Sequence, residues 1–130
     1  MNKDVMSVFN AYNEALINGD FPGVFETMAD DIQWHQPGNG PLSGVTVGKQ
    51  ALGEHLGKFA EKSNGTFKVL TNWVSSNDCF VAANVTFLAE RGDGETLDMN
   101  GIDLFRIEEG KIKEVWLFSA DGAVEDAFWK

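Results

Sequence analysis

The chain has 130 residues, among them ten Lys or Arg and twenty Asp or Glu, for a formal net charge of -10. This length is typical of one domain and is sufficient for a hydrophobic core without disulfides, so we expect residues 1–130 to form a single domain. The acidic balance disfavours nucleic acids and anionic membranes as partners, because both repel a negative surface. Ten Phe, four Trp and one Tyr indicate a thick core, a ligand cavity, or both.

Several classes of site and location are disfavoured by the sequence. It contains no apolar run of signal-peptide length at its start and no stretch of about 18 apolar residues, so we expect a soluble, cytoplasmic protein. His35 and His55 have no metal-ligand partner at helical spacing, which argues against a metal site. Residues 44–49 are one residue short of a phosphate-binding loop. We therefore expect the protein to work without a cofactor.

The first segment has the hydrophobic spacing of an amphipathic helix. Apolar residues recur there at intervals of four, three and four, namely at Val5, Phe9, Tyr12 and Leu16. This spacing predicts a helix over about residues 3–18. Asp20 and Pro22 then favour a second, short helix, because both residue types are typical of helix starts.

Shorter elements separate this pair of helices from a third. The Asp30-Asp31 pair is typical of a turn, and residues 32–36 predict a short strand. Residues 37–44 are rich in Gly, Pro, Asn and Ser and are expected to form a loop. Apolar residues at helical spacing then predict a third helix over roughly residues 48–62.

From Thr66 onward the hydrophobic period changes to two, which is typical of β-strands. Four strands are predicted, over about residues 66–76, 79–90, 96–107 and 112–118. The links between them are short, so neighbouring strands are expected to pair as an antiparallel meander. The final segment, residues 119–130, is expected to pack back onto the body. The order of elements predicts an α+β fold in which three helices pack against one curved antiparallel sheet.

Strand alternation singles out one carboxylate. Asp103 shares a strand face with apolar residues, namely Leu97, Met99, Phe105 and Ile107. A carboxylate in such a row is unfavourable unless it is paired, hydrogen-bonded or protonated. The alternatives are a shifted register or a salt bridge at the sheet edge. Tyr12 presents a similar case on the apolar stripe of the first helix, where its hydroxyl needs a partner that a backbone carbonyl could also supply.

These residues lie in stretches that resemble a known family. The sequence Tyr-Asn-Glu-Ala-Leu-Ile-Asn-Gly-Asp over residues 12–20, followed by Met-Ala-Asp-Asp over 28–31, resembles the opening of the ketosteroid isomerases and their SnoaL-like relatives. The sequence Ile-Asp-Leu-Phe-Arg over residues 102–106, followed by Gly-Lys-Ile over 110–112, carries the same resemblance. The family belongs to the nuclear transport factor 2-like superfamily. The resemblance implies a cone-shaped, curved sheet wrapped on three helices, with an apolar pocket that opens at one end.

Two further stretches resemble the SnoaL-like branch more than the steroid isomerases. They are Trp-His-Gln-Pro-Gly over residues 34–38 and Asp-Ala-Phe-Trp over residues 126–129. That branch includes polyketide cyclases. The resemblance also implies a homodimer formed through the outer face of the sheet, to which Ile102 and Leu104 contribute apolar surface.

The resemblance implies catalytic roles for three residues. Tyr12 and Asp103 match the tyrosine and the aspartic acid of the family's oxyanion hole, and His35 stands where the steroid isomerases carry their aspartate base. In ketosteroid isomerase such an acid is kept neutral by an apolar site, so that it can donate a hydrogen bond. We therefore expect an isomerase or a polyketide-cyclase-like enzyme that acts on an apolar, carbonyl-bearing small molecule. His35 removes a proton beside the carbonyl, and the two donors stabilise the enolate.

Aromatic residues of the strands are expected to line the ligand pocket, and they are Trp34, Trp73, Phe87, Phe105 and Trp116. Two alternatives to catalysis of this kind stay open. The same fold also serves as a non-catalytic module that binds a small ligand or forms dimers. The epoxide hydrolases of the superfamily use an Asp-Arg-Asp set, but Arg106 is expected on the strand face opposite Asp103, which disfavours hydrolysis.

Overall fold

The computed structural model describes residues 5–129 as four helices and six strands. The helices are α1 (Val5–Ile17), α2 (Phe21–Glu26), α3 (Lys49–Lys62) and α4 (Gly122–Phe128). The strands are β1 (Met28–Gln36), β2 (Gly44–Val47), β3 (Lys68–Asn77), β4 (Phe80–Glu90), β5 (Thr96–Glu108) and β6 (Lys111–Ser119). Among the described residues, no helix combines the length and the apolar character needed to cross a bilayer.

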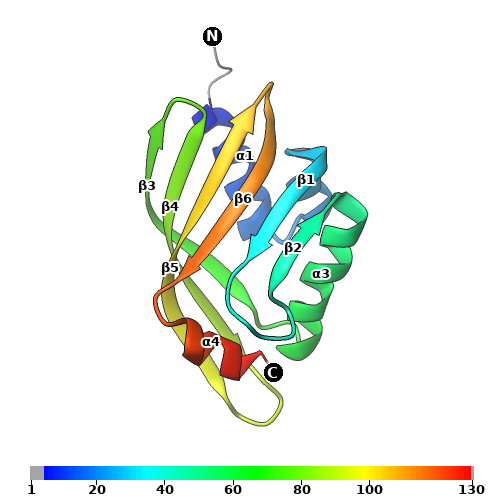
Figure 1. Cartoon of the computed structure of the whole chain (residues 1–130), viewed down its shortest axis with the longest axis vertical. Coiled ribbons are helices and arrows are strands. Elements are labelled where there is room, and N and C mark those ends of the chain that lie inside the picture. The colour runs from blue at the N-terminus through cyan, green and yellow to red at the C-terminus, as the bar shows by residue number, and fades with distance from the viewer. Residues whose placement is uncertain (1–4, 130) are drawn as a thin grey trace.

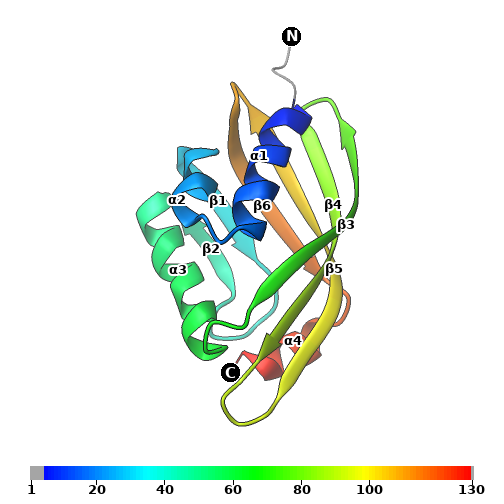
Figure 2. The same ribbon diagram turned by 180° about the vertical axis from the view of Figure 1, so that it is seen from behind.

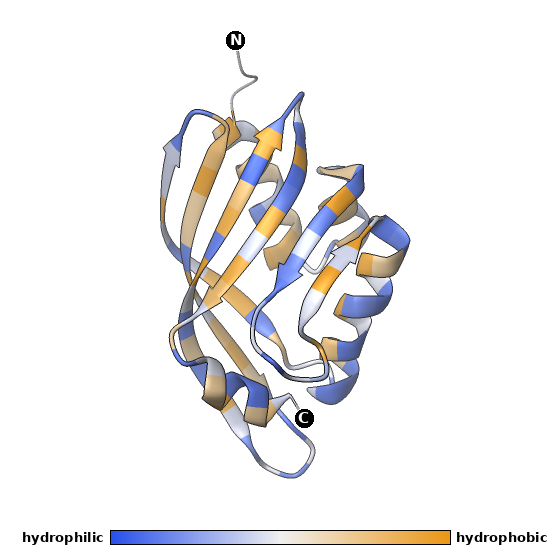
Figure 3. Ribbon diagram, in the orientation of Figure 1, coloured by the Kyte–Doolittle hydropathy of each residue, from blue (hydrophilic) through white to orange (hydrophobic). Residues whose placement is uncertain are grey.

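One curved sheet, with strand order β2-β1-β6-β5-β4-β3, forms the body of the molecule (Figure 1). Helices α1, α2 and α3 pack on its concave face, and α4 lies at one end, next to the turn that leaves β6 (Figure 2). Apolar and polar residues alternate along the central strands (Figure 3), because one face of the sheet is packed and the other is not. This architecture confirms the predicted α+β fold.

The predicted helices have the expected local causes. The apolar stripe of α1 is confirmed, since Val5, Phe9 and Tyr12 are its buried residues. Helix α2 begins after Asp20, whose carboxylate accepts a hydrogen bond of 3.0 Å from the backbone N–H of Gly23. Such a cap satisfies a backbone donor that the first turn of a helix leaves unpaired.

The predicted turn at Asp30 and Asp31 is wrong, because both residues lie within β1. Both side chains are exposed, and the pairing of β1 with β6 shifts register between Met28 and Gln33. An irregularity of this kind lets two consecutive polar residues face solvent without ending the strand. The alternation of side chains along β1 is therefore interrupted at this point.

The sequence does not predict β2 or the helical form of the final segment. Strand β2 is only four residues long and pairs antiparallel with β1. The final segment packs back onto the body as expected, and it does so as α4, capped by Asp121, which accepts a hydrogen bond of 3.2 Å from Val124 N–H. Arg91 Nη1 anchors the end of α4 through a hydrogen bond of 2.8 Å to the carbonyl oxygen of Phe128.

The sheet is mixed rather than antiparallel. The meander from β3 to β6 is antiparallel, as predicted, but β1 and β6 run parallel. A parallel pair needs a long crossover connection. The chain between β1 and β6 supplies it with α3 and four strands, and this pairing brings residues from both halves of the sequence to one cavity.

The face of β5 predicted to be apolar lies inward. Leu97, Met99, Phe105 and Ile107 are buried on it. Gly101 stands in the same row, where a Cβ atom would collide with the carbonyl oxygen of Phe118 and crowd a neighbouring phenyl ring. The close approach of β5 and β6 at this point therefore requires glycine.

Candidate functional site

A cavity of about 90 Å³ lies between the concave face of the sheet and the helices. Its walls are mostly apolar and include the rings of Trp34, Phe59, Phe67 and Phe87. Ligand pockets commonly measure roughly 300–1,000 Å³, and an apolar cavity of roughly 150 Å³ holds a benzene molecule. In this conformation the cavity is smaller than that benzene site, so a ligand of one ring is its upper limit and requires some outward movement of the walls.

Tyr12 and Asp103 line this cavity together. Tyr12 stands on α1, and its ring packs edge-on against Phe105 with the ring centroids 5.1 Å apart. Asp103 stands on β5, between Ala83 of β4 and Leu117 of β6. Within residues 5–129, neither the Tyr12 hydroxyl nor the Asp103 carboxyl makes a hydrogen bond. Both groups are therefore available to a molecule in the cavity.

Burial keeps both of these groups in their protonated forms. Burial, and to a lesser degree the charge of Glu125, raise the pKa of Asp103 from 3.8 to about 7. Burial and then the neighbouring Asp103 raise the pKa of Tyr12 well above its ordinary value of 10. Near neutral pH the cavity thus presents a tyrosine O–H and, over a large fraction of molecules, a carboxylic acid O–H.

Glu125 is a cavity residue that the sequence analysis does not identify. It lies on α4, is 8% exposed, and lines the cavity with Tyr12 and Asp103. Ser119 Oγ donates a hydrogen bond to its carboxylate. The indole N–H of Trp129 makes no hydrogen bond of ordinary geometry within the described chain, yet it lies near enough to favour the ionised carboxylate.

Burial raises the pKa of Glu125, and the donors from Ser119 and Trp129 oppose that effect. The signal that could have revealed this residue is its spacing of three from Phe128, which is also buried. Residues three apart lie on the same face of a helix. The sequence alone does not show that this segment is helical or that its buried face meets the cavity.

Gln36, the last residue of β1, is a further polar residue of the lining. Its Oε1 accepts hydrogen bonds from Trp34 Nε1 and from His55 Nε2, each of 3.1 Å. His55 is buried on α3, and this burial lowers its pKa, so the imidazole is neutral at pH 7. In the sequence His55 stands out only as a potential metal ligand that lacks a partner, whereas in the structure it donates a hydrogen bond to Gln36.

His35, which the sequence suggests as the base, does not line the cavity. Consecutive residues of a strand point to opposite faces, and Trp34 points inward, so His35 points outward. Its ring stacks on Trp116 at a centroid distance of 5.4 Å. The structure therefore brings Tyr12 and Asp103 together but places His35 on the other face of the sheet.

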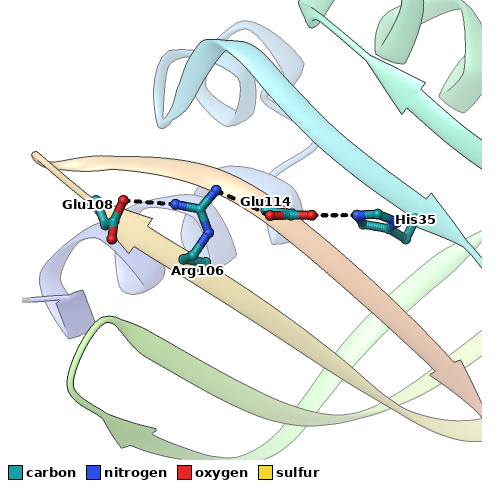
Figure 4. Close-up of polar contacts among 4 residues, drawn as sticks. All are labelled: His35, Arg106, Glu108 and Glu114. Atoms are coloured by element: carbon teal, nitrogen blue, oxygen red, sulfur yellow. Dashed lines mark hydrogen bonds and ion pairs between the residues drawn. The ribbon is translucent and has the colours of Figure 1, made fainter.

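On that outer face, the side chains of His35, Glu114, Arg106 and Glu108 form a polar row across β1, β6 and β5 (Figure 4). His35 Nε2 lies 2.6 Å from Glu114 Oε2, Arg106 Nη2 lies 3.2 Å from Glu114 Oε1, and Arg106 Nη1 lies 2.8 Å from Glu108 Oε1. Against the effect of burial, the hydrogen bonds from His35 and Arg106 lower the pKa of Glu114. Because Arg106 belongs to this row, the described cavity lacks the Asp-Arg-Asp set of an epoxide hydrolase.

The five aromatic residues expected on the pocket wall lie in three different places. Trp34 and Phe87 line the cavity. Phe105 is 1% exposed and belongs to the core, where it packs against the ring of Tyr12. Trp73 and Trp116 lie on the outer face, Trp73 being 56% exposed. An irregularity in β3 just before Trp73 inverts the alternation there and turns this side chain outward.

Known proteins are similar to this chain in sequence and in fold. The SnoaL-like domain family matches residues 9–115. The chain belongs to the SnoaL-like family. A protein of unknown function with a cystatin-like fold from Xanthomonas campestris is 41% identical, with a TM-score of 0.90 over 99% of this chain and 98% of that one. A putative SnoaL-like polyketide cyclase from Mesorhizobium loti is 26% identical, with a TM-score of 0.70 over 89% of this chain and 99% of that one.

An uncharacterised protein of Mycobacterium tuberculosis is 31% identical over 116 residues, which cover 88% of each chain. These similarities confirm the resemblance to the SnoaL-like family and the cone-like fold that it implies. They are consistent with an isomerase-like, cyclase-like or ligand-binding protein for small molecules.

The cavity of this SnoaL-like protein contains groups that can donate hydrogen bonds and a carboxyl group that can accept a proton. Within residues 5–129, no group of three His, Cys, Asp or Glu side chains is arranged to hold a metal ion. Neutral O–H donors in an apolar cavity stabilise negative charge that develops on an oxygen atom. A buried carboxylate with a raised pKa accepts a proton more readily than an ordinary one. The two capabilities occur side by side here.

Proposed function

We propose that this SnoaL-like protein is a cofactor-independent enzyme that moves a proton at the carbon beside a carbonyl group of a small, apolar molecule. The supporting observation is that Tyr12, Asp103 and Glu125 share one apolar cavity. Two of them can donate hydrogen bonds to a carbonyl oxygen, and the third can take a proton. Isomerisation and polyketide-cyclase-like ring closure both begin with such a step.

The surroundings of the two carboxyl groups favour different protonation states. Ser119 and Trp129 favour the ionised form of Glu125, whereas no group of the described chain donates a hydrogen bond to Asp103. Two carboxyls in environments that separate their pKa values divide the acid and base roles between them. We therefore assign Glu125 as the base and protonated Asp103 as a donor, in place of the base role that the sequence suggests for His35.

The step balances with these groups alone. The Glu125 carboxylate takes the proton, the C–H electron pair becomes the carbon–carbon double bond of an enolate, and charge moves to the carbonyl oxygen. The O–H groups of Tyr12 and Asp103 stabilise that oxygen. Return of the proton from Glu125 to a different carbon gives an isomer. Attack of the enolate carbon on a second carbonyl of the same molecule closes a ring, and the resulting alkoxide takes the proton back.

The test is deuterium exchange at the carbons beside the carbonyl of cyclohexanone, followed by proton NMR in D₂O. We expect the protein to accelerate exchange over the buffer rate, and the Tyr12→Phe variant to lose about 100-fold of that acceleration, as loss of one donor to an oxyanion does elsewhere. His35→Ala should retain the rate within about twofold, because His35 lies on the other face of the sheet.

Two results would contradict this proposal. If cyclohexanone binds without faster exchange, the protein is a ligand-binding module rather than an enzyme of this kind. If His35→Ala slows exchange as strongly as Tyr12→Phe does, the base is His35 and the assignment to Glu125 is wrong.

We also propose that the outer face of the sheet joins two copies of the chain. In the described chain, six large apolar side chains on this face are 36% exposed or more, namely Val45, Val47, Leu70, Trp73, Phe80 and Phe118. Exposed apolar surface gathered on one face is typical of an interface. The adjacent row of acidic and basic residue types suits pairing with the same row of a second copy across a two-fold axis.

Sedimentation velocity tests the dimer. Trp73→Glu and Phe118→Glu each place a carboxylate in the apolar face, so we expect both variants to sediment as monomers at a concentration where the wild type is dimeric. Ile17→Glu is the matched control, since Ile17 is 64% exposed but lies on α1, away from this face. A wild type that is monomeric at every concentration, or a control that dissociates equally, would rule out this interface.

A further inference from the structure

We propose that Gln36 forms a second polar subsite in the cavity and that the natural ligand is a neutral one-ring compound with two oxygen functions. One oxygen is seated on Tyr12 and Asp103, and the other accepts a hydrogen bond from the amide nitrogen of Gln36. The inference rests on the proposed function only for the binding of the first oxygen by Tyr12 and Asp103.

The orientation of the Gln36 amide follows from its neighbours. The indole nitrogen of a tryptophan can only donate a hydrogen bond, so the Gln36 atom 3.1 Å from Trp34 Nε1 is the carbonyl oxygen. His55 Nε2 donates to the same oxygen at 3.1 Å. With Oε1 occupied twice, the amide nitrogen is the group left over. Within residues 5–129 it makes no hydrogen bond, although Gln36 lines the cavity.

Two side chains hold the amide in this orientation. Trp34 is buried on β1, and its ring forms part of the cavity wall. The imidazole of His55 packs edge-on against Phe59, with the ring centroids 5.1 Å apart. A glutamine whose oxygen is held by two donors from buried rings loses little further freedom when its nitrogen binds a ligand. His55 therefore acts as a positioning residue for Gln36.

Gln36 stands at a different place in the cavity from the oxyanion donors. A second void of about 10 Å³ adjoins the cavity beside α4, and both Gln36 and Glu125 line it. Tyr12 and Asp103 line only the larger cavity. Gln36 therefore lies at the α4 end of the cavity, apart from Tyr12 and Asp103, which would bind the first oxygen. The small void has room for about one water molecule, so the ligand occupies the larger cavity.

The charge of the lining decides the class of ligand. The cavity contains the carboxyls of Asp103 and Glu125, and no Lys or Arg is among its described lining residues. An anionic ligand, such as a carboxylate or a phosphate, would meet like charge in a low-dielectric site without a cation to pair with it. The second oxygen function must therefore be a neutral acceptor, and a ketone fits the amide donor best. Together with the cavity volume, this describes a one-ring diketone or keto-ether.

The test compares two matched pairs of ligands. Cyclohexanone and 1,4-cyclohexanedione differ by one carbonyl across the ring, and 4-ethylcyclohexanone and 4-acetylcyclohexanone differ by a carbonyl one bond farther out. Dissociation constants from NMR titration of the wild type should favour the dicarbonyl member of at least one pair by about tenfold, the value of one additional hydrogen bond of about 1.4 kcal/mol. This measurement does not depend on turnover.

Two variants then assign the preference to Gln36. Gln36→Met keeps the length of the side chain and a weak sulfur acceptor for Trp34 and His55, but it has no donor. We expect this variant to bind both members of the pair within about twofold of each other. Gln33→Leu is the control on the same strand, because Gln33 is exposed and does not line the cavity, and it should keep the full preference. If Gln36→Met does not melt cooperatively, Gln36→Leu replaces it under the same conditions, because leucine also has no donor.

The outcomes separate this inference from the proposed function. A tenfold preference that disappears in the Gln36 variant and persists in the Gln33 variant supports the second subsite. Equal binding of both members in the wild type, or a preference unchanged by the Gln36 variant, overturns it and leaves the exchange reaction untouched. Binding of none of the four ketones would overturn the proposed seat at Tyr12 and Asp103 as well.

Discussion

Replacement of Glu125 by Gln should slow the exchange of protons beside a carbonyl by about 10²- to 10⁴-fold, the range expected when a positioned base is removed. An amide has nearly the same shape, and its carbonyl oxygen can still accept the hydrogen bond from Ser119, so the fold should be retained. Only the capacity to take the proton is lost. Asp98→Asn is the control, because Asp98 is an exposed carboxylate on β5.

The pH dependence of the wild-type rate should report both carboxyls. Exchange requires Glu125 to be ionised and Asp103 to be protonated. The rate should therefore fall as the pH rises past about 7, where Asp103 loses its proton. It should also fall on the acid side, at a pH above the ordinary pKa of 4.5 for a glutamate, because burial raises the pKa of Glu125.

A Glu125→Gln variant with more than about a fifth of the wild-type rate would exclude this residue as the base.

Asp103→Asn should stabilise the protein at alkaline pH. A pKa of about 7 in the folded state, against 3.8 for an exposed carboxyl, corresponds to about 4 kcal/mol. Below pH 3.8 both the folded and the unfolded chains hold the proton, so the group contributes no penalty. Between pH 3.8 and about 7 only the folded state holds it, and the free energy of unfolding falls as the pH rises.

Above pH 7 the full penalty is present in the wild type, whereas the neutral Asn side chain carries none. We expect the variant to exceed the wild type in free energy of unfolding by up to about 4 kcal/mol at pH 8, and to match it closely at pH 4. Urea titrations at both pH values, with Asp98→Asn as the exposed control, measure this difference. An equal effect at the two pH values would mean that Asp103 titrates normally and cannot serve as a neutral donor.

Much of the fold could be predicted because local periodicity reflects burial. The stripe of α1 and the alternation of β5 both follow from which side chains must leave water. Tyr12 and Asp103 were found in this way, as a hydroxyl and a carboxylate on otherwise apolar faces. The turn expected at Asp30-Asp31 and the pocket position expected for Trp73 are not found, because a strand irregularity at each place changes the face without changing the composition.

The rest of the site depends on contacts between distant parts of the chain. Glu125 reaches the cavity only because α4 folds back across the end of the sheet, and Gln36 meets His55 only because α3 packs beside β1. Neither contact leaves a periodic signal in the sequence. His35 shows the opposite case, in which a residue attractive by its chemistry and by resemblance is turned to the outer face by its place in the strand.

The sequence by itself determined an acidic α+β chain of the SnoaL-like type, with a tyrosine and a carboxylate facing inward, because hydrophobic burial constrains local pattern. Only the tertiary structure decided which polar groups share the cavity, because that depends on the parallel pairing of β1 with β6 and on the docking of α4. Burial there raises the pKa of Asp103 and Glu125 and makes two ordinary acids suited to proton transfer.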